Sequence, residues 1–138
     1  MLPEWPPGTV TVLATGGGPP HAIPVSAALR AGPAVALLGL AASRESLARL
    51  RSEPRAALVV LAAGDLAFTA HGRATVLDEV VDGVVAVRLD VDDVQDHGQP
   101  TFVIEDGVRW RWTDEAAAER DREVRRALRA LADTLPPP

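Results

Sequence analysis

The sequence predicts a single, mainly β domain: a small barrel accompanied by two helices. Its 138 residues suit one compact domain, and 47% of them are hydrophobic, so the chain can bury a sizeable core. Short β-branched and apolar runs follow one another with Gly- and Pro-rich turns between them, and only two segments have a helical period. Strands at this spacing with few helices are typical of a small barrel and not of a doubly wound sheet.

Three strands are expected before the first helix. They cover residues 9–15, 21–28 and 33–40, which are rich in Val, Leu, Ile, Thr and Ala. Residues 16–20 (GGGPP) lie between the first two strands, and no helix follows them to meet a pyrophosphate. We therefore expect a hairpin turn there and no phosphate-binding loop. Pro24 requires an edge or bulge position, because it cannot donate to a ladder.

The first predicted helix covers residues 43–52. Leu47 and Leu50 lie three residues apart in this segment, and charged residues surround them. Ser43 is the expected N-cap, and Pro54 ends the element. The result is a short helix after the third strand.

Further strands are expected after the short helix. Gly72, inside one of them, indicates a β-bulge or the close approach of another backbone. Asp106-Gly107 predicts a two-residue hairpin turn between the last two strands. The predicted strands cover residues 55–62, 66–77, 83–94, 101–105 and 108–113.

A second helix is expected at the C-terminal end of the chain, capped by Asp114 or Thr113. Its other faces carry charged pairs such as Glu119 with Arg122. We expect one domain over residues 1–138, divided into a barrel (9–112), a C-terminal helix (113–135) and a frayed tail (136–138). The apolar stripe of the helix consists of Ala117, Val124, Leu128, Leu131 and Leu135.

Composition excludes several classes of function. The chain has no cysteine, which excludes disulfides, thiolate metal sites and cysteine nucleophiles. It also has no lysine, which excludes Schiff-base chemistry and a Walker-type P-loop. The formal net charge of −5 argues against a nucleic-acid binder. No signal peptide and no apolar run of about 20 residues is visible, so we expect a cytoplasmic protein without a membrane partner.

The sequence shows no metal-ligand spacing and no catalytic motif, although Ser, His and Asp, the residue types of a nucleophilic triad, are all present. His21, His71 and His97 are far apart and lack the spacing of metal ligands. The acidic run between Asp90 and Asp96 lacks the glycine and terminal glutamate of a calcium loop. No GxSxG elbow occurs. We therefore expect no metal, and the catalytic residues stay unassigned.

Ser43-Arg44 is the best candidate for an anion site. A hydroxyl and a guanidinium lie at the predicted helix start, where free N–H groups and the helix dipole favour negative charge. Arg49 and Arg51 lie on later turns and can add to this site. The alternative is a simple helix cap with a solvated arginine.

The run Arg109-Trp110-Arg111-Trp112 concentrates two of the few aromatic residues. On a strand the tryptophans share one face and the arginines share the other. One interpretation is a core or dimer-interface pair. The other is stacking on a flat ring, with an arginine reaching a phosphate.

Four motifs occur in an order typical of one known family. They lie at residues 12–15 (VLAT), 18–25 (GPPHAIPV), 43–55 (SRESLARLRSEPR) and 72–76 (GRATV). With this order and spacing, the chain resembles the FMN-binding split-barrel family, the pyridoxamine 5′-phosphate oxidase-like proteins, over about residues 9–94. The family's helix lysine falls on Ser46 and its asparagine on Arg49 when the motif is aligned from Pro54.

The resemblance implies a six-stranded split β-barrel with a short helix after strand 3 and a C-terminal helix. Such proteins are usually homodimers with two flavins at the interface. The implied function is an FMN-binding oxidoreductase acting on an unidentified small molecule. The alternatives are a reductase that uses the deazaflavin F420, and a non-enzymatic dimer that binds haem or no cofactor. The implied cofactor-binding residues are Pro24, Val25, Ser26, Leu40, Ala41, Ser43, Arg44, Arg49, Trp110 and Arg111, the last two from the partner subunit.

Overall fold

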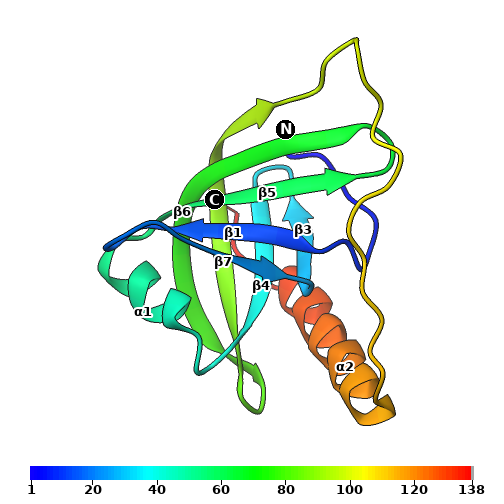
Figure 1. Cartoon of the computed structure of the whole chain (residues 1–138). Coiled ribbons are helices and arrows are strands. Elements are labelled where there is room, and N and C mark those ends of the chain that lie inside the picture. Colours follow the sequence, from blue (N-terminus) through cyan, green and yellow to red (C-terminus); the bar gives the residue numbers. More distant parts are fainter. Residues whose placement is uncertain (138) are drawn as a thin grey trace.

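Seven antiparallel strands form one curved sheet, and two helices lie against it (Figure 1). The computed structural model describes residues 1–137. The strand order is β2-β1-β5-β6-β7-β4-β3, so β2 and β3 are the edges and the barrel is split. The elements are β1 (Thr11–Thr15), β2 (His21–Val25), β3 (Ala28–Gly32), β4 (Val35–Ala41), α1 (Glu45–Ser52), β5 (Arg55–Ala62), β6 (Leu66–Val81), β7 (Val84–Asp96) and α2 (Glu115–Ala132).

The expected mainly β split barrel with two helices is confirmed, and its sheet has one strand more than the six that the family resemblance implies. The predicted strand 21–28 divides, because β2 ends at Val25 and β3 begins at Ala28. The segment 28–32 then pairs with β4 and forms the second edge of the sheet. Pro24 lies opposite Val12 on the edge strand β2, the kind of position that a residue without an N–H donor requires.

The glycine-rich run after β1 is the expected turn. β1 and β2 pair as a hairpin, and the turn places Gly17 at φ +75° and Gly18 at φ +143°. Arg49 braces this turn from α1, since its Nη1 donates to the carbonyls of Gly16 (3.1 Å) and Pro19 (2.6 Å). The glycines thus serve chain reversal, because these φ values are ones that other residues rarely adopt.

Gly72 combines the two features expected of it. The pairing of β6 with β7 shifts register between His71 and Gly72, which marks a bulge. A Cβ atom at Gly72 would lie 2.1 Å from the carbonyl oxygen of Asp90 on β7. The backbones of β6 and β7, the two longest strands, therefore approach each other so closely at this position that only glycine fits.

The predicted hairpin over residues 101–113 is wrong. This segment runs along the surface from β7 to α2 (yellow to orange in Figure 1) and is not a pair of strands. Its backbone has other partners: Val10 N–H donates to the Val108 carbonyl (2.8 Å), and Ile104 N–H donates to Asp65 Oδ1 (2.7 Å). At Gly107 an added Cβ would lie 2.3 Å from the Leu61 carbonyl oxygen. The glycine thus permits close approach to β5 and does not form a turn.

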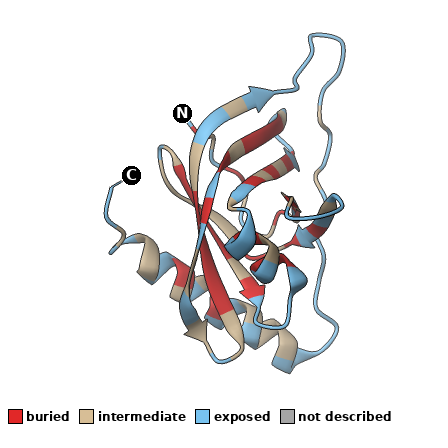
Figure 2. Ribbon diagram, turned by 90° about the vertical axis from the view of Figure 1, so that its left-hand side faces the viewer, coloured by how far each residue is buried: buried red, intermediate tan, exposed pale blue. Residues whose placement is uncertain are grey.

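The apolar side chains form two cores. One fills the inside of the barrel, where alternate residues of the strands, such as Leu13, Leu58, Val87 and Leu89, are buried. The other lies between α2 and the outer surface of β4 and β7, where Leu128 is completely buried. Figure 2 shows buried positions along the strands and on one side of α2, while the connection between β7 and α2 is exposed.

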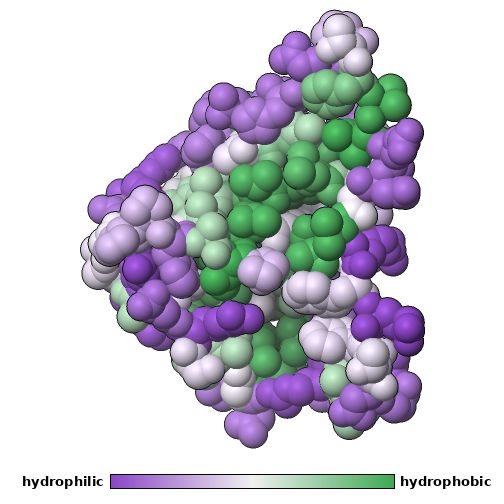
Figure 3. All heavy atoms as spheres, in the orientation of Figure 1, coloured by the Kyte–Doolittle hydropathy of each residue, from purple (hydrophilic) through white to green (hydrophobic). Residues whose placement is uncertain are grey.

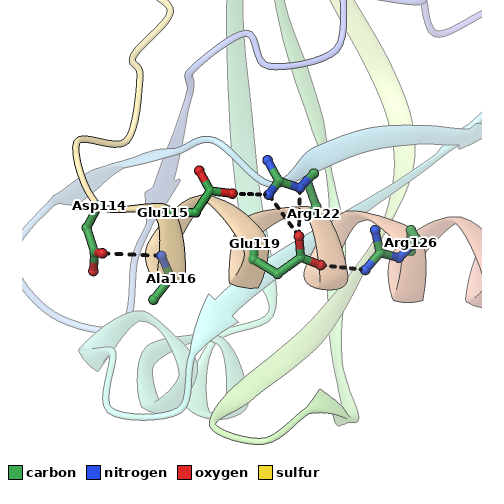
Figure 4. A network of polar contacts seen from close by, with 6 residues as sticks. All are labelled: Asp114, Glu115, Ala116, Glu119, Arg122 and Arg126. Carbon is green, nitrogen blue, oxygen red and sulfur yellow. Dashed lines mark hydrogen bonds and ion pairs between the residues drawn. The ribbon is translucent and has the colours of Figure 1, made fainter.

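The exposed side of α2 carries a network of charged side chains (Figure 4). Arg122 contacts Glu115 and Glu119, and Arg126 contacts Glu119. Hydrogen bonds from Arg122 and Arg126 lower the pKa of the Glu119 carboxyl. Because these groups are solvent-exposed, the network adds little to the free energy of unfolding.

The helix starts test the predicted caps. Asp114 caps α2 as expected, because its carboxylate accepts a hydrogen bond from Ala116 N–H. The prediction that Ser43 caps α1 is wrong, since the N-cap is Arg44 and no side chain caps this helix. At the C-terminal end of the described chain, buried Arg88 donates a hydrogen bond to the Pro136 carbonyl (2.9 Å). Pro138 of the expected frayed tail lies outside the described residues.

Neither helix of residues 1–137 is long and apolar enough to cross a bilayer.

Candidate functional site

A hollow of about 140 Å³ lies where the ends of β2 and β4 meet the connection between β7 and α2. Its floor is formed by strand ends, one wall is aromatic, and a guanidinium group stands at its rim. The lining residues are Pro24, Val25, Ser26, Ala27, Gly39, Leu40, Ala41, Arg44, Trp110 and Trp112.

The floor is built by one backbone hydrogen bond that joins two strand ends. Gly39 N–H on β4 donates to the Ala27 carbonyl (2.8 Å), so the turn after β2 lies beside β4. Ser26 is thereby brought next to Leu40 and Ala41, although fourteen or more residues separate them in the chain. The division of the predicted strand 21–28 into two elements thus creates this floor.

The aromatic wall consists of Trp110 and Trp112. Their ring centroids lie 6.0 Å apart in an edge-to-face arrangement. The side chains stay 45% and 39% exposed, which is high for the largest apolar residue type. Apolar surface of this kind beside a hollow is typical of a binding site.

Arg44 supplies positive charge at the start of α1. Its side chain is exposed, and among residues 1–137 it has no ion-pair partner. The neighbouring Glu45 carboxylate is occupied, because it lies 3.2 Å from Arg49 Nε and 3.4 Å from the His21 ring. Arg44 therefore remains available to an anion, where the free N–H groups of the helix start also favour negative charge.

The structure brings most of the predicted site residues together. Ser43, Arg49 and Arg111 do not line the hollow. Arg49 is directed at the turn after β1 instead. The residues of the prediction that line the hollow are Pro24, Val25, Ser26, Leu40, Ala41, Arg44 and Trp110.

Three lining residues were missed by the sequence analysis. Ala27 and Gly39 carry no chemical signal, and only the hydrogen bond between them reveals their place. Trp112 was noted as a partner of Trp110, and its spacing was the signal that could have identified it.

The hollow continues toward α2. A second space of about 210 Å³ shares Ser26, Ala27, Gly39, Ala41 and Trp112 with the first and extends to Arg120, Asp121 and Val124 of the helix. Together the two spaces form a groove along the end of β4. Both spaces are open to solvent.

An uncovered apolar surface adjoins the groove. Val12 on β1 and Leu61 on β5 are 38% and 49% exposed. Val59 lies opposite Val12 in the sheet, and Pro24 of the groove lies opposite Val12 on its other side. Figure 3, in the orientation of Figure 1, shows hydrophobic side chains gathered in the middle of this surface. We call the surface formed by exposed Val12, Leu61 and Val108 and half-buried Val59 the apolar face.

A surface ion pair lies at the opposite end of β5. Arg55 contacts Asp92 of β7 at 2.5 Å, and this hydrogen bond lowers the pKa of the Asp92 carboxyl. A lowered carboxyl pKa means that the pair contributes stability above the ordinary pKa of aspartate and loses it as the pH falls through the lowered value. The contribution is small because both groups are exposed. The pair is intact near neutral pH and lies away from the groove.

Comparison with known proteins identifies the fold. No protein-family model matches the chain, and no curated protein does so. Solved structures do match. A candidate pyridoxamine 5′-phosphate oxidase from Lactobacillus delbrueckii is 18% identical with a TM-score of 0.53, and the match covers 62% of this chain and 83% of that one.

Two further structures share the fold. An FAD-binding protein from Mesorhizobium loti is 15% identical with a TM-score of 0.52, over 62% of this chain and 83% of that one. General stress protein 26 from Bacillus anthracis is 11% identical with a TM-score of 0.54, over 75% and 90%. At these identities the comparison establishes the fold alone, and that fold is the split barrel of pyridoxamine 5′-phosphate oxidase-like proteins.

Proposed function

We propose, from the split-barrel fold and the groove along β4, that this chain binds FMN and acts as an oxidoreductase on a small molecule. The observation that carries the proposal is the convergence of Arg44, Trp110 and the strand ends around one hollow. Names of proteins with the same fold support a flavin, since one of them is an FAD-binding protein.

The chemistry of the groove fits FMN. Trp110 and Trp112 offer the flat apolar surface on which an aromatic ring system stacks. Arg44 offers a guanidinium that matches the phosphate of FMN and lacks a protein partner among the described residues. Pro24, Val25 and Leu40 supply apolar contacts beside them.

The open groove points to a second subunit. Its two spaces, of about 140 and 210 Å³, are both open to solvent, whereas ligand sites usually bury most of the ligand surface. The apolar face begins at the rim of the groove through Pro24 and Val12. Two chains that join through this face would cover both the apolar side chains and the open side of the groove. We therefore propose a homodimer with the cofactor at its interface.

Bound flavin would supply hydride or electron transfer, and the residues of this chain would supply position and electrostatics. Arg44 would neutralise phosphate charge, and the tryptophans would hold the ring and exclude water from it. Ser26 is the hydroxyl of the groove and would donate to a polar edge of the ring. No role as general acid or base is assigned to any residue.

Replacing Arg44 with alanine should weaken FMN binding about 10- to 100-fold, because a hydrogen bond to a charged group contributes about 1.5–3 kcal/mol. The measurement is a fluorescence titration of flavin-free protein with FMN, with FAD and F420 titrated in parallel. Arg51→Ala is the matched control, since Arg51 is exposed on the same helix but does not line the groove. A wild-type protein that takes up none of the three cofactors would refute the proposal. Equal loss in both variants would refute the role of Arg44.

Replacing Leu61 with glutamate should break the dimer, because the new carboxylate would be desolvated at a buried interface. The measurement is light scattering coupled to size-exclusion chromatography. We expect a dimer for the wild type and a monomer for Leu61→Glu. Ala130→Glu places the same charge on exposed α2 and should leave the dimer intact. A monomeric wild type would contradict the proposed interface.

A further inference from the structure

A separate hollow of about 220 Å³ lies between the N-terminal segment, β3 and α2. Its walls include Trp5 from the N-terminal segment and Leu128 from α2, both buried apolar residues. Its polar lining is dominated by arginine: Arg30 on β3 and Arg125 and Arg129 on α2. We call this space the arginine hollow. The function proposed above makes no use of it.

The arginines here outnumber the carboxylates. Arg30 forms an ion pair with Glu4 at 3.4 Å, and its Nε donates a hydrogen bond to the Leu2 carbonyl at 2.7 Å. Asp121 is the ion-pair partner of Arg125, at 3.0 Å. Arg129 has no ion-pair partner within residues 1–137. In a chain whose net charge is −5, this is a local excess of positive charge.

Gly8 shows how closely two guanidinium groups approach the backbone in this region. It lines the arginine hollow at φ +87°. A Cβ atom at this position would lie 3.3 Å from Arg109 Nη2 and 3.5 Å from Arg125 Nη1. Arg109, which belongs to the connection before α2, therefore adds a further positive charge beside the hollow. Like charges brought together this way repel unless an anion lies between them.

Arg125 is also incompletely satisfied by the protein. Its buried Nε lies 3.0 Å from the Asp121 carboxylate, an ion pair that falls outside hydrogen-bond geometry. Its Nη1 lies beside Gly8 at the hollow. The Nη atoms of this guanidinium can therefore bind an anion while Nε faces Asp121.

We propose that the arginine hollow binds a small organic dianion that carries carboxylate or phosphate groups. Guanidinium groups bind both by paired hydrogen bonds, and several arginines at one site favour a ligand with more than one negative charge. Trp5 and Leu128 provide apolar contacts for a short carbon skeleton. Ser26 lines both this hollow and the groove, so the two ligands would bind side by side. The proposal does not depend on flavin binding.

The test is calorimetric titration of the full chain with inorganic phosphate and, separately, with succinate. We expect the wild type to bind at least one of them, and the stronger of the two identifies the preferred anionic group. Arg129→Gln should weaken this binding about tenfold, since one charged hydrogen-bonding group is lost. Arg125→Gln should do the same. Arg126→Gln, on the same helix but outside the hollow, should change the affinity less than about twofold.

The exposed position of Arg129 keeps the test decisive even if Arg125→Gln fails to fold. Absence of binding by both probes to the wild type would overturn the proposal, as would an equal loss of affinity in Arg126→Gln. FMN titration of Arg129→Gln separates the two proposals, because its FMN affinity should equal that of the wild type. Anion binding without FMN binding would refute only the proposed function.

Discussion

Gly72→Ala is expected to lower the free energy of unfolding by about 3 kcal/mol or more, because the added methyl group overlaps the backbone of the neighbouring strand. The Cβ would lie 2.1 Å from the Asp90 carbonyl oxygen and 3.0 Å from Val91 Cα. Both are backbone atoms of β7, which cannot rotate away as a side chain can. The overlap is relieved only if β6 and β7 separate at the bulge. These two strands pair in the middle of the sheet.

Urea denaturation followed by circular dichroism measures this loss. Gly32→Ala is the matched control, since Gly32 also lies in a strand but its Cβ would meet only Val35 at 3.9 Å. We expect the control to change the stability by less than about 1 kcal/mol. Equal midpoints for the two variants would mean that the strands do not approach as closely at Gly72 as the structure places them.

Leu128→Ala is expected to cost about 2–5 kcal/mol, because it removes a completely buried side chain from the small core under α2. That core has few large members, so neighbouring side chains can fill little of the cavity. The loss should also loosen α2 from the sheet. Hydrogen exchange of the α2 amides should therefore accelerate more than exchange in β5 and β6.

Leu131→Ala is the control for this second prediction. Leu131 lies one turn later on the same stripe but is only partly buried. Its replacement should cost clearly less than that of Leu128, measured by thermal unfolding. If the two variants lose equal stability, α2 is not anchored chiefly through Leu128.

Most of the barrel could be predicted from the sequence because the spacing of apolar residues within each strand indicates which side chains are buried. In β7 the residues Val85, Val87 and Leu89 recur at every second position, and these are the side chains that the structure buries inside the barrel. Gly72 was equally informative, because a glycine in the middle of a strand pattern has few explanations. Such signals need no knowledge of distant contacts.

The errors arose where distant contacts decide the local structure. Asp106-Gly107 has the composition of a hairpin turn, yet Gly107 serves close contact with Leu61 on β5. The segment 28–32 looks unremarkable alone and becomes a strand because β4 offers it an edge. At α1, Ser43 and Arg44 are adjacent candidates for the N-cap. Arg44 N–H bonds to the Ala41 carbonyl in the preceding turn, and Arg44 takes the N-cap position.

The candidate site could be predicted in part for a related reason. Pro24, Leu40 and Arg44 were selected through a resemblance, and the structure brings them to one hollow. Arg49 was selected by its charge and by its place in the family motif, and its carbonyl partners at the turn after β1 could not be predicted from the sequence. Charge indicates what a residue can bind, but only the fold determines which partner lies within reach.

The connection between β7 and α2 carries side chains of both proposed sites, while the strands of the barrel form most of the core. It carries the tryptophans of the groove and Arg109 beside the arginine hollow, yet few backbone hydrogen bonds, among them those of Ile104 and Val108, attach it to the rest. The barrel core contains none of its residues. If the two proposed sites bind ligands, their preference would change through substitutions in this connection while the barrel keeps its sequence, and this is the segment to exchange when engineering a new specificity.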